Sequence, residues 1–252
     1  CADVDLTDLN LTVAKEIKSW VTLGWDNCIL PPRYRKFKSF DSRKTGLLGP
    51  RVNLTGISLD AVTVTFGRDE LIDLTEANLA SGELPEKWTY KLDGANLDGT
   101  HVRSRIAWGC NIKGQPWMIP DTSKIVDGCL FGIGADFSGY DFSGMNLEGV
   151  QFIESKLHGA NISGTELRGA NLSGVLASNL QGIPKSLPVD YQLRFGFFLG
   201  PASTLNGVNL SGKNLASINL FSCSMAGSKL DSTNLTPVSY THLRAHETPE
   251  HL

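Results

Sequence analysis

The sequence predicts an all-β solenoid in which the chain turns a corner every five residues. Three observations support this prediction. In residues 135–174 a large apolar residue recurs at every fifth position, a mostly polar residue precedes it, and Gly usually follows two positions later. A helix repeats after about 3.6 residues and a strand after about 2, so neither element could bury such a set. Four corners make a coil of about 20 residues, and stacked coils make a solenoid.

We call the recurring apolar position the centre. A small residue often stands two positions before it, as at Ala135, Ala160 and Ala170, where it leaves room in the narrow interior. Gly suits the corner because it tolerates a positive φ. Centres one coil apart should stack, as Phe137 over Leu157. The centres that we predict to form the core are Leu54, Leu59, Leu74, Leu79, Leu97, Phe137, Phe142, Leu147, Phe152, Leu157, Ile162, Leu167, Leu172, Leu205, Leu210, Leu215, Leu220, Met225, Leu230 and Leu235.

The A-(D/N)-(L/F)-(S/T)-G pattern of residues 135–174 resembles the pentapeptide repeat family. This resemblance implies a right-handed quadrilateral β-helix, and in our register it covers roughly Val52 to Leu235, with gaps. Some members of that family mimic B-DNA and bind type II topoisomerases such as gyrase. The resemblance therefore suggests one specific partner, which the charge pattern can be used to judge.

Residues 1–48 carry only degenerate repeats, followed by a basic loop. The apolar residues Val13, Ile17, Trp20 and Val21 fall at helical spacing, which indicates a short helix, with a degenerate coil as the alternative. Residues 30–50 alternate basic and aromatic side chains, as a nucleic-acid patch would. Nothing elsewhere in the sequence extends that patch, so we favour a solvated loop whose aromatic side chains pack on the solenoid.

The solenoid domain is expected to span residues 49–236, at about 20 residues per coil, with roughly 11 coils before residue 237. Irregular cassettes interrupt it near 84–92, 114–132 and 182–201. Leu48, Phe131 and Leu199 each stand six residues before the next centre, with Gly in the gap, and we interpret the extra residue as a bulge. The similarity of these interruptions predicts duplication of multi-coil units.

Both ends of the sequence look non-native. The first residue is Cys, so we expect a cut or processed N-terminus. Residues 237–252 match the one-frame translation of a transposase-type sequencing adapter, as in a metagenomic fragment of a bacterial gene. We exclude this predicted tail, with His242, His246 and His251, from fold and site arguments. A repeat module cut from a larger protein is therefore one of the alternatives.

The composition is that of a folded protein whose net charge is too small to create a strong electrostatic field. The apolar fraction is 41%, the net charge is −3, and no apolar run is long enough to span a membrane. Five acids against two bases give residues 135–174 a net charge of only −3. We therefore predict no nucleic-acid partner and keep DNA mimicry as the lesser alternative. The sequence assigns no compartment, with the cytoplasm as default, and no oligomeric state.

No catalytic, cofactor-binding or metal-binding residues are predicted. His101 and His158 lack carboxylate or Cys neighbours at ligand spacing and are interpreted as surface residues. Cys110 and Cys223 fall on the small inward position, so we favour core packing over a disulfide or a metal. Asn-x-Ser/Thr sequons arise automatically from the repeat. We therefore predict a non-enzymatic structural or protein–protein interaction solenoid with an unidentified protein partner.

Overall fold

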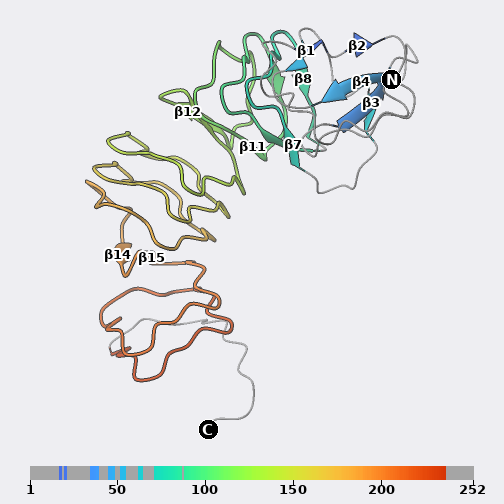
Figure 1. Cartoon of the computed structure of the whole chain (residues 1–252). Helices are drawn as coiled ribbons and strands as arrows, with labels where there is room; N and C mark the ends of the chain where they lie inside the picture. The colour runs from blue at the N-terminus through green and yellow to red at the C-terminus, as the bar shows by residue number, and fades with distance from the viewer. Residues whose placement is uncertain are drawn as a thin grey trace. The chain divides into compact units, whose positions relative to one another are not determined.

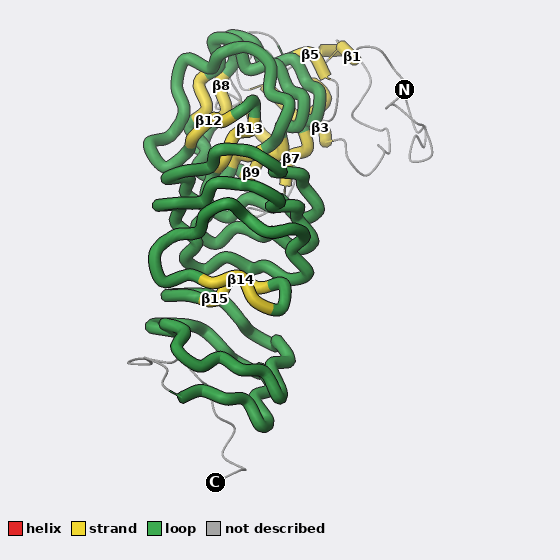
Figure 2. Tube along the Cα trace, turned by 90° about the vertical axis from the view of Figure 1, so that its left-hand side faces the viewer, coloured by secondary structure: helices red, strands yellow, loops and turns green. Residues whose placement is uncertain are grey.

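Figure 1 presents the computed structural model of the chain, which describes residues 17–18, 20–21, 35–39, 45–48, 52–54, 62–64, 71–86 and 88–236. Within these ranges the chain forms short strands, isolated bridges and turns, and no helix (Figure 2). It divides into two compact units, one ending at Gly132 and the other beginning at Ile133. Each unit is described by itself.

The strands are two to five residues long. In the first unit β1 pairs with β5, β8 with β10, and β7, β9 and β11 form a parallel sheet, whereas β2-β4-β3-β6 is antiparallel. The bounds are β1 Ile17–Lys18, β2 Trp20–Val21, β3 Arg35–Ser39, β4 Thr45–Leu48, β5 Val52–Asn53, β6 Val62–Val64, β7 Leu71–Asp73, β8 Glu83–Leu84, β9 Thr89–Lys91, β10 His101–Val102, β11 Ala107–Trp108, β12 Lys124–Val126, β13 Cys129–Phe131, β14 Gln192–Arg194 and β15 Phe197–Leu199.

The start of the first unit differs from the prediction. The helix considered over residues 13–21 is absent from its described part, because Ile17–Lys18 and Trp20–Val21 are strands paired with β5 and β4. The stretch interpreted as a basic loop contains the antiparallel strands β3 and β4. A two-residue strand needs no periodicity of its own, so pairing with a distant segment decides its structure.

The coils of the first unit are shorter than predicted. Parallel bridges join Asn78 to Asn96 and Asn96 to Lys113, and each of these steps falls short of four five-residue sides. The first of these steps, from Asn78 to Asn96, contains the extended strand β9 between the buried residues Leu84 and Leu92. This strand replaces two five-residue sides with a shorter piece of chain, because an extended strand covers more distance per residue than a turned segment.

The coils around residues 135–174 in the second unit have the predicted length. Bridges join Asp136 to Lys156 and Asp141 to Asn161, so each step spans four five-residue sides. Phe137 N–H donates to the carbonyl of Lys156 at 2.8 Å, and Lys156 N–H donates back to the carbonyl of Ala135 at 2.8 Å. Figure 2 shows these coils stacked one above another.

Each corner is closed by one backbone hydrogen bond. The carbonyl of a centre accepts the N–H of the third residue after it, as between Phe137 and Tyr140 at 3.1 Å. The residue before that donor has a positive φ, 73° at Gly139, which is the geometry of a type II turn. At the same corner position Glu154 has a φ of 57°, a conformation that side chains with a Cβ disfavour.

The polar residue before each centre also serves the corner. Asp136 Oδ1 accepts the N–H of Ser138 at 3.1 Å, and Asp141 Oδ1 accepts the N–H of Ser143 at 3.0 Å. Asn161 makes the same bond to Ser163 at 3.1 Å. Asp and Asn are favoured at this position because their short side chains bond their own backbone two residues on.

The centres line the interior of each unit. Leu59 lies outside the described residues, and Leu230 and Leu235 are partly exposed. The other predicted centres have at most 4% of their surface exposed: Leu54, Leu74, Leu79, Leu97, Phe137, Phe142, Leu147, Phe152, Leu157, Ile162, Leu167, Leu172, Leu205, Leu210, Leu215, Leu220 and Met225.

Two of the interruptions contain a β-hairpin where the sequence suggested only a bulge. We name them cassette A, residues 110–132 with hairpin β12–β13, and cassette B, residues 178–200 with hairpin β14–β15. Asp127-Gly128 and Phe195-Gly196 form their two-residue loops, with positive φ at both residues, as in type I′ turns.

The two cassettes share their backbone contacts. Ile112 N–H donates to the carbonyl of Gly128 in cassette A, and Leu180 N–H donates to that of Gly196 in cassette B. Trp117 N–H donates to the carbonyl of Thr100 at 3.0 Å, as Lys185 N–H does to that of Thr165 at 2.9 Å. The two cassettes can therefore be aligned without a gap, with position 112 on 180, 117 on 185 and 128 on 196.

Candidate interaction surface

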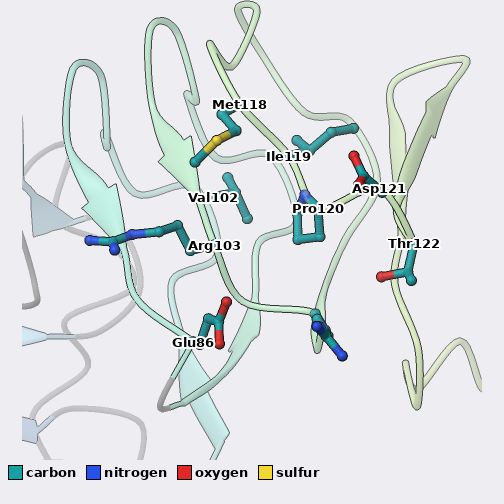
Figure 3. Close-up of a pocket in the computed structure, with 9 residues that line it drawn as sticks. Glu86, Val102, Arg103, Met118, Ile119, Pro120, Asp121 and Thr122 are labelled. Atoms are coloured by element: carbon teal, nitrogen blue, oxygen red, sulfur yellow. The ribbon is translucent and has the colours of Figure 1, made fainter.

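A cavity of about 420 Å³ opens in the first unit, beside cassette A (Figure 3). Strand β10 supplies the buried Val102, and the loop before β12 supplies Met118 and the residues after it. Figure 3 shows Val102 between the side chains of Arg103 and Pro120. The residues that line the cavity are Glu86, Val102, Arg103, Arg105, Met118, Ile119, Pro120, Asp121 and Thr122.

The charges of the lining balance, with two arginines and two carboxylates. Arg103 forms an ion pair with Glu83, on the neighbouring strand β8. The lining contains no His or Cys, and its one hydroxyl, that of Thr122, has no hydrogen-bond partner. Among the described residues no group of three or more His, Cys, Asp or Glu side chains could hold a metal ion.

Two large apolar side chains are exposed in the loop that supplies part of the cavity lining. Trp117 has 78% of its surface exposed and the lining residue Met118 has 45%. Ile119, the next residue, is partly buried against the core of the first unit. We name Trp117, Met118, Ile119, Pro120 and the adjoining cavity the Trp117 surface. Exposed apolar groups beside a cavity mark interaction sites on soluble proteins, and Trp is enriched among binding hot spots.

Backbone pairing holds the Trp117 surface against the preceding coil. Met118 is bridged in parallel to His101, and Val102 N–H donates to the carbonyl of Met118 at 2.8 Å. The ring of His101 meets that of Trp117 edge to face, with centroids 4.7 Å apart. The exposed indole is therefore supported from one side and presented to solvent on the other.

A disulfide joins Cys110 and Cys129, which contradicts our preference for core packing at Cys110. Cys110 follows β11 and is partly exposed, whereas Cys129 lies in β13 and is buried. Their sequence separation is 19, and the antiparallel bridge between Gly109 and Leu130 places the two cysteines opposite one another. The available sequence signal was this spacing, which a search for adjacent or evenly framed cysteines overlooks.

The remaining predicted residues do not form a site. His158 is exposed, with its Nδ1 2.8 Å from Ser178 Oγ, and His101 packs on Trp117 as described above. Cys223 is buried, and burial raises the pKa of its thiol to about 11, so it is a poor nucleophile. Cys1, Cys28 and the tail 237–252 lie outside the described residues.

Three acids of the second unit lie beside bases of the next coil. Lys156 is 3.7 Å from Asp136, and Arg168 is 3.8 Å from Glu148. Lys185 pairs with Glu166, and its hydrogen bond and charge hold the pKa of that carboxyl below its ordinary value. These ion pairs interrupt any continuous row of negative charge on this unit.

The pKa values of two corner aspartates are also lowered. At Asp141 the backbone N–H of Ser143 is the main cause, followed by the hydroxyl of Ser143. At Asp136 partial burial acts in the opposite direction and would raise the pKa. Bonds from Ser138 and the charge of Lys156 outweigh that effect, so the pKa of Asp136 is lowered overall.

Comparisons with known proteins agree with the repeat. The family model described as "Pentapeptide repeats" matches residues 135–174 as eight copies. A search of curated proteins finds no match to the chain. Within the described residues no helix is long and apolar enough to cross a membrane.

Several solved structures resemble the chain at low identity. The pentapeptide repeat protein Rfr23 from the cyanobacterium Cyanothece 51142 is 19% identical, with 56% of this chain and 90% of that chain covered and a TM-score of 0.23. HetL of Nostoc sp. strain PCC 7120, a pentapeptide repeat protein involved in heterocyst differentiation regulation, is 19% identical. The match covers 75% of this chain and 65% of HetL, with a TM-score of 0.16. A trypsin-treated form of QnrB1, a plasmid-mediated fluoroquinolone resistance protein, is 12% identical. The match covers 75% of this chain and 79% of that structure, with a TM-score of 0.18.

Proposed function

Residues 135–174 are pentapeptide repeats, and we propose that the coils of this chain serve as a non-enzymatic scaffold that binds a protein partner through the Trp117 surface. The observation that carries this proposal is the exposure of Trp117, at 78%, on a backbone that is fixed to the neighbouring coil. Trp117 and Met118 are neighbours in the chain and are both exposed, and exposed apolar residues that lie together mark interaction sites more often than single ones do.

The arrangement suits a folded or extended polypeptide more than a small molecule. The cavity-lining residue Met118 directly follows the exposed Trp117 in the chain, so a partner could insert one side chain into the cavity and pack another part on Trp117. An indole on a fixed backbone loses little conformational entropy on binding, which favours affinity. The balanced charges of the lining favour a partner without a strong net charge at the contact.

The finer fold proposal is a right-handed quadrilateral β-helix for the regular coils. Support comes from four closed corners per coil and from the family match to residues 135–174. That residues 49–236 form one solenoid domain, with 1–48 as degenerate repeats and 237–252 as a non-native tail, stays a prediction.

The test is affinity recovery with the full chain from an extract of the organism that encodes it. A partner should be retained by the parent chain and lost with Trp117→Ser combined with Met118→Ser. The matched control is Ile183→Ser, because Ile183 is 82% exposed but lies in cassette B. A protein bound equally by the parent and the Trp117 variant would refute the proposed surface.

A further inference from the structure

The disulfide closes the loop that carries most of the Trp117 surface. Cys110 and Cys129 enclose residues 111–128, and within this segment lie Trp117 and five of the nine cavity-lining residues. Reduction of this single bond therefore acts on the surface and leaves the coils of residues 135–174 unaltered in covalent structure.

Cassette B provides an internal comparison, because it has the same hairpin without a disulfide. Phe197 of β15 packs against the core of the second unit. The Tyr191 ring packs directly on Gly200, where an added Cβ would lie 2.5 Å from a ring carbon, and its hydroxyl donates to the carbonyl of Pro201. Two aromatic side chains thus anchor hairpin β14–β15.

Cassette A lacks both aromatic anchors. In the alignment of the two cassettes, Ser123 stands at the position of Tyr191 and Cys129 at that of Phe197. The Ser123 hydroxyl is buried without a hydrogen-bond partner, and so is that of the residue before it, Thr122. Cys129 instead forms the bond to Cys110, which is equivalent to Ser178 of cassette B. The covalent link stands where aromatic packing is found in the other cassette.

We propose that the Cys110–Cys129 disulfide is a redox-sensitive lock that keeps the Trp117 surface formed in oxidising surroundings and lets it loosen in reducing ones. In the opening reaction a dithiol gives up two electrons and becomes a disulfide. The Cys110–Cys129 bond breaks, and each sulfur takes one of the two protons that the dithiol releases. Disulfides persist in oxidising compartments and are reduced elsewhere. The Cys110–Cys129 bond should therefore be closed in an oxidising environment and open in a reducing one. As regulation of partner binding the lock rests on the proposed function, but its structural effect does not.

The test measures hydrogen exchange of the full chain before and after dithiothreitol, with alkylation to count free Cys110 and Cys129 thiols. We expect peptides of residues 111–128 to exchange at least tenfold faster after reduction, and peptides of the equivalent residues 179–196 to stay within twofold. No partner is involved in this measurement, so its failure is distinct from failure of the proposed function.

Two variants sharpen the result. Cys110→Ser combined with Cys129→Ser should exchange rapidly over 111–128 with or without the dithiol. Cys110→Ser with Ser123→Tyr and Cys129→Phe gives cassette A the anchors of cassette B, and should restore slow, dithiol-insensitive exchange. If hydrogen exchange over residues 111–128 stays unchanged while both thiols are labelled, the proposed lock is wrong. So would equal loosening of both cassettes, or free thiols in the air-oxidised parent.

Discussion

Replacing Leu147 with Ala tests whether the centres stabilise the coils. Leu147 is 0% exposed, and the centre one coil later, Leu167, is 2% exposed. Backbone bonds hold the two coils together on both sides of Leu147, with Leu147 N–H to the Glu166 carbonyl at 2.8 Å and Gly149 N–H to the Arg168 carbonyl at 3.1 Å. The coils therefore have little freedom to collapse into the space that the substitution leaves.

The expected loss follows from the buried carbon removed. Leu→Ala deletes three buried carbons at about 0.8 kcal/mol each, and the residual cavity brings typical losses to about 2–5 kcal/mol. For a chain of this size about 1 kcal/mol lowers the melting temperature by about 2–4 °C, so a central loss of about 3 kcal/mol predicts a fall of about 6–12 °C.

The matched control is Leu230→Ala. Leu230 occupies the same position of the motif but is only partly buried, so it should lose about half as much stability. Thermal unfolding followed by circular dichroism measures both. A Leu147→Ala chain that melts within about 2 °C of the parent, or that loses no more than Leu230→Ala, would refute the inward assignment of the centres.

Three further predictions concern the corners and the charged faces. Glu154→Gly should raise the stability by about 1 kcal/mol, because Glu154 has a φ of 57°. Gly159→Ala should lower the stability by a similar amount, because Gly159 has a φ of 67° and an added Cβ would meet no atom within 4 Å. Urea denaturation measures the stability of both variants, and shifts of equal sign would contradict the corner argument. The pKa of Asp141 is lowered from its ordinary 3.8, so its stabilising contribution is present above about pH 4 and is lost as the pH falls through the lower folded value. Asp141→Asn keeps an oxygen acceptor for the Ser143 N–H, so between pH 5 and 2 it should lose less stability than the parent, as measured by urea denaturation. An identical loss would be evidence against the Asp141–Ser143 hydrogen bond. Finally, the chain at micromolar concentration should leave gyrase supercoiling unaffected, because bases interrupt the acidic rows at Asp136, Glu148 and Glu166; inhibition relieved by added salt would support DNA mimicry instead.

The period of five made the regular coils predictable. It identified residues such as Leu147 and Phe152, which the structure places in the interior, and it indicated a corner at Gly139. Those features depend only on contacts within five residues and on contacts between neighbouring coils of equal length. The same regularity could not give the shortened step from Asn78 to Asn96, because this step depends on how strand β9 replaces two sides.

The cassettes were harder to predict for a different reason. The Asp127-Gly128 pair is a strong hairpin signal, but it lies in a stretch that the repeat treats only as an interruption. The disulfide depends on the antiparallel pairing of Gly109 with Leu130, which the repeat does not indicate and which brings Cys110 to Cys129. The exposure of Trp117 likewise depends on tertiary packing, since an aromatic residue in a loop is as compatible with burial as with solvent contact.

The most direct test of the interaction surface is photo-cross-linking from Trp117 itself. The full chain carrying Trp117→p-benzoylphenylalanine is irradiated in the extract, and the products are compared with those of Lys185→p-benzoylphenylalanine, the equivalent position of cassette B. We predict a discrete cross-linked partner from position 117 that position 185 does not give and that unlabelled parent chain displaces. The absence of such a product, or the same products from both positions, would contradict the proposed surface.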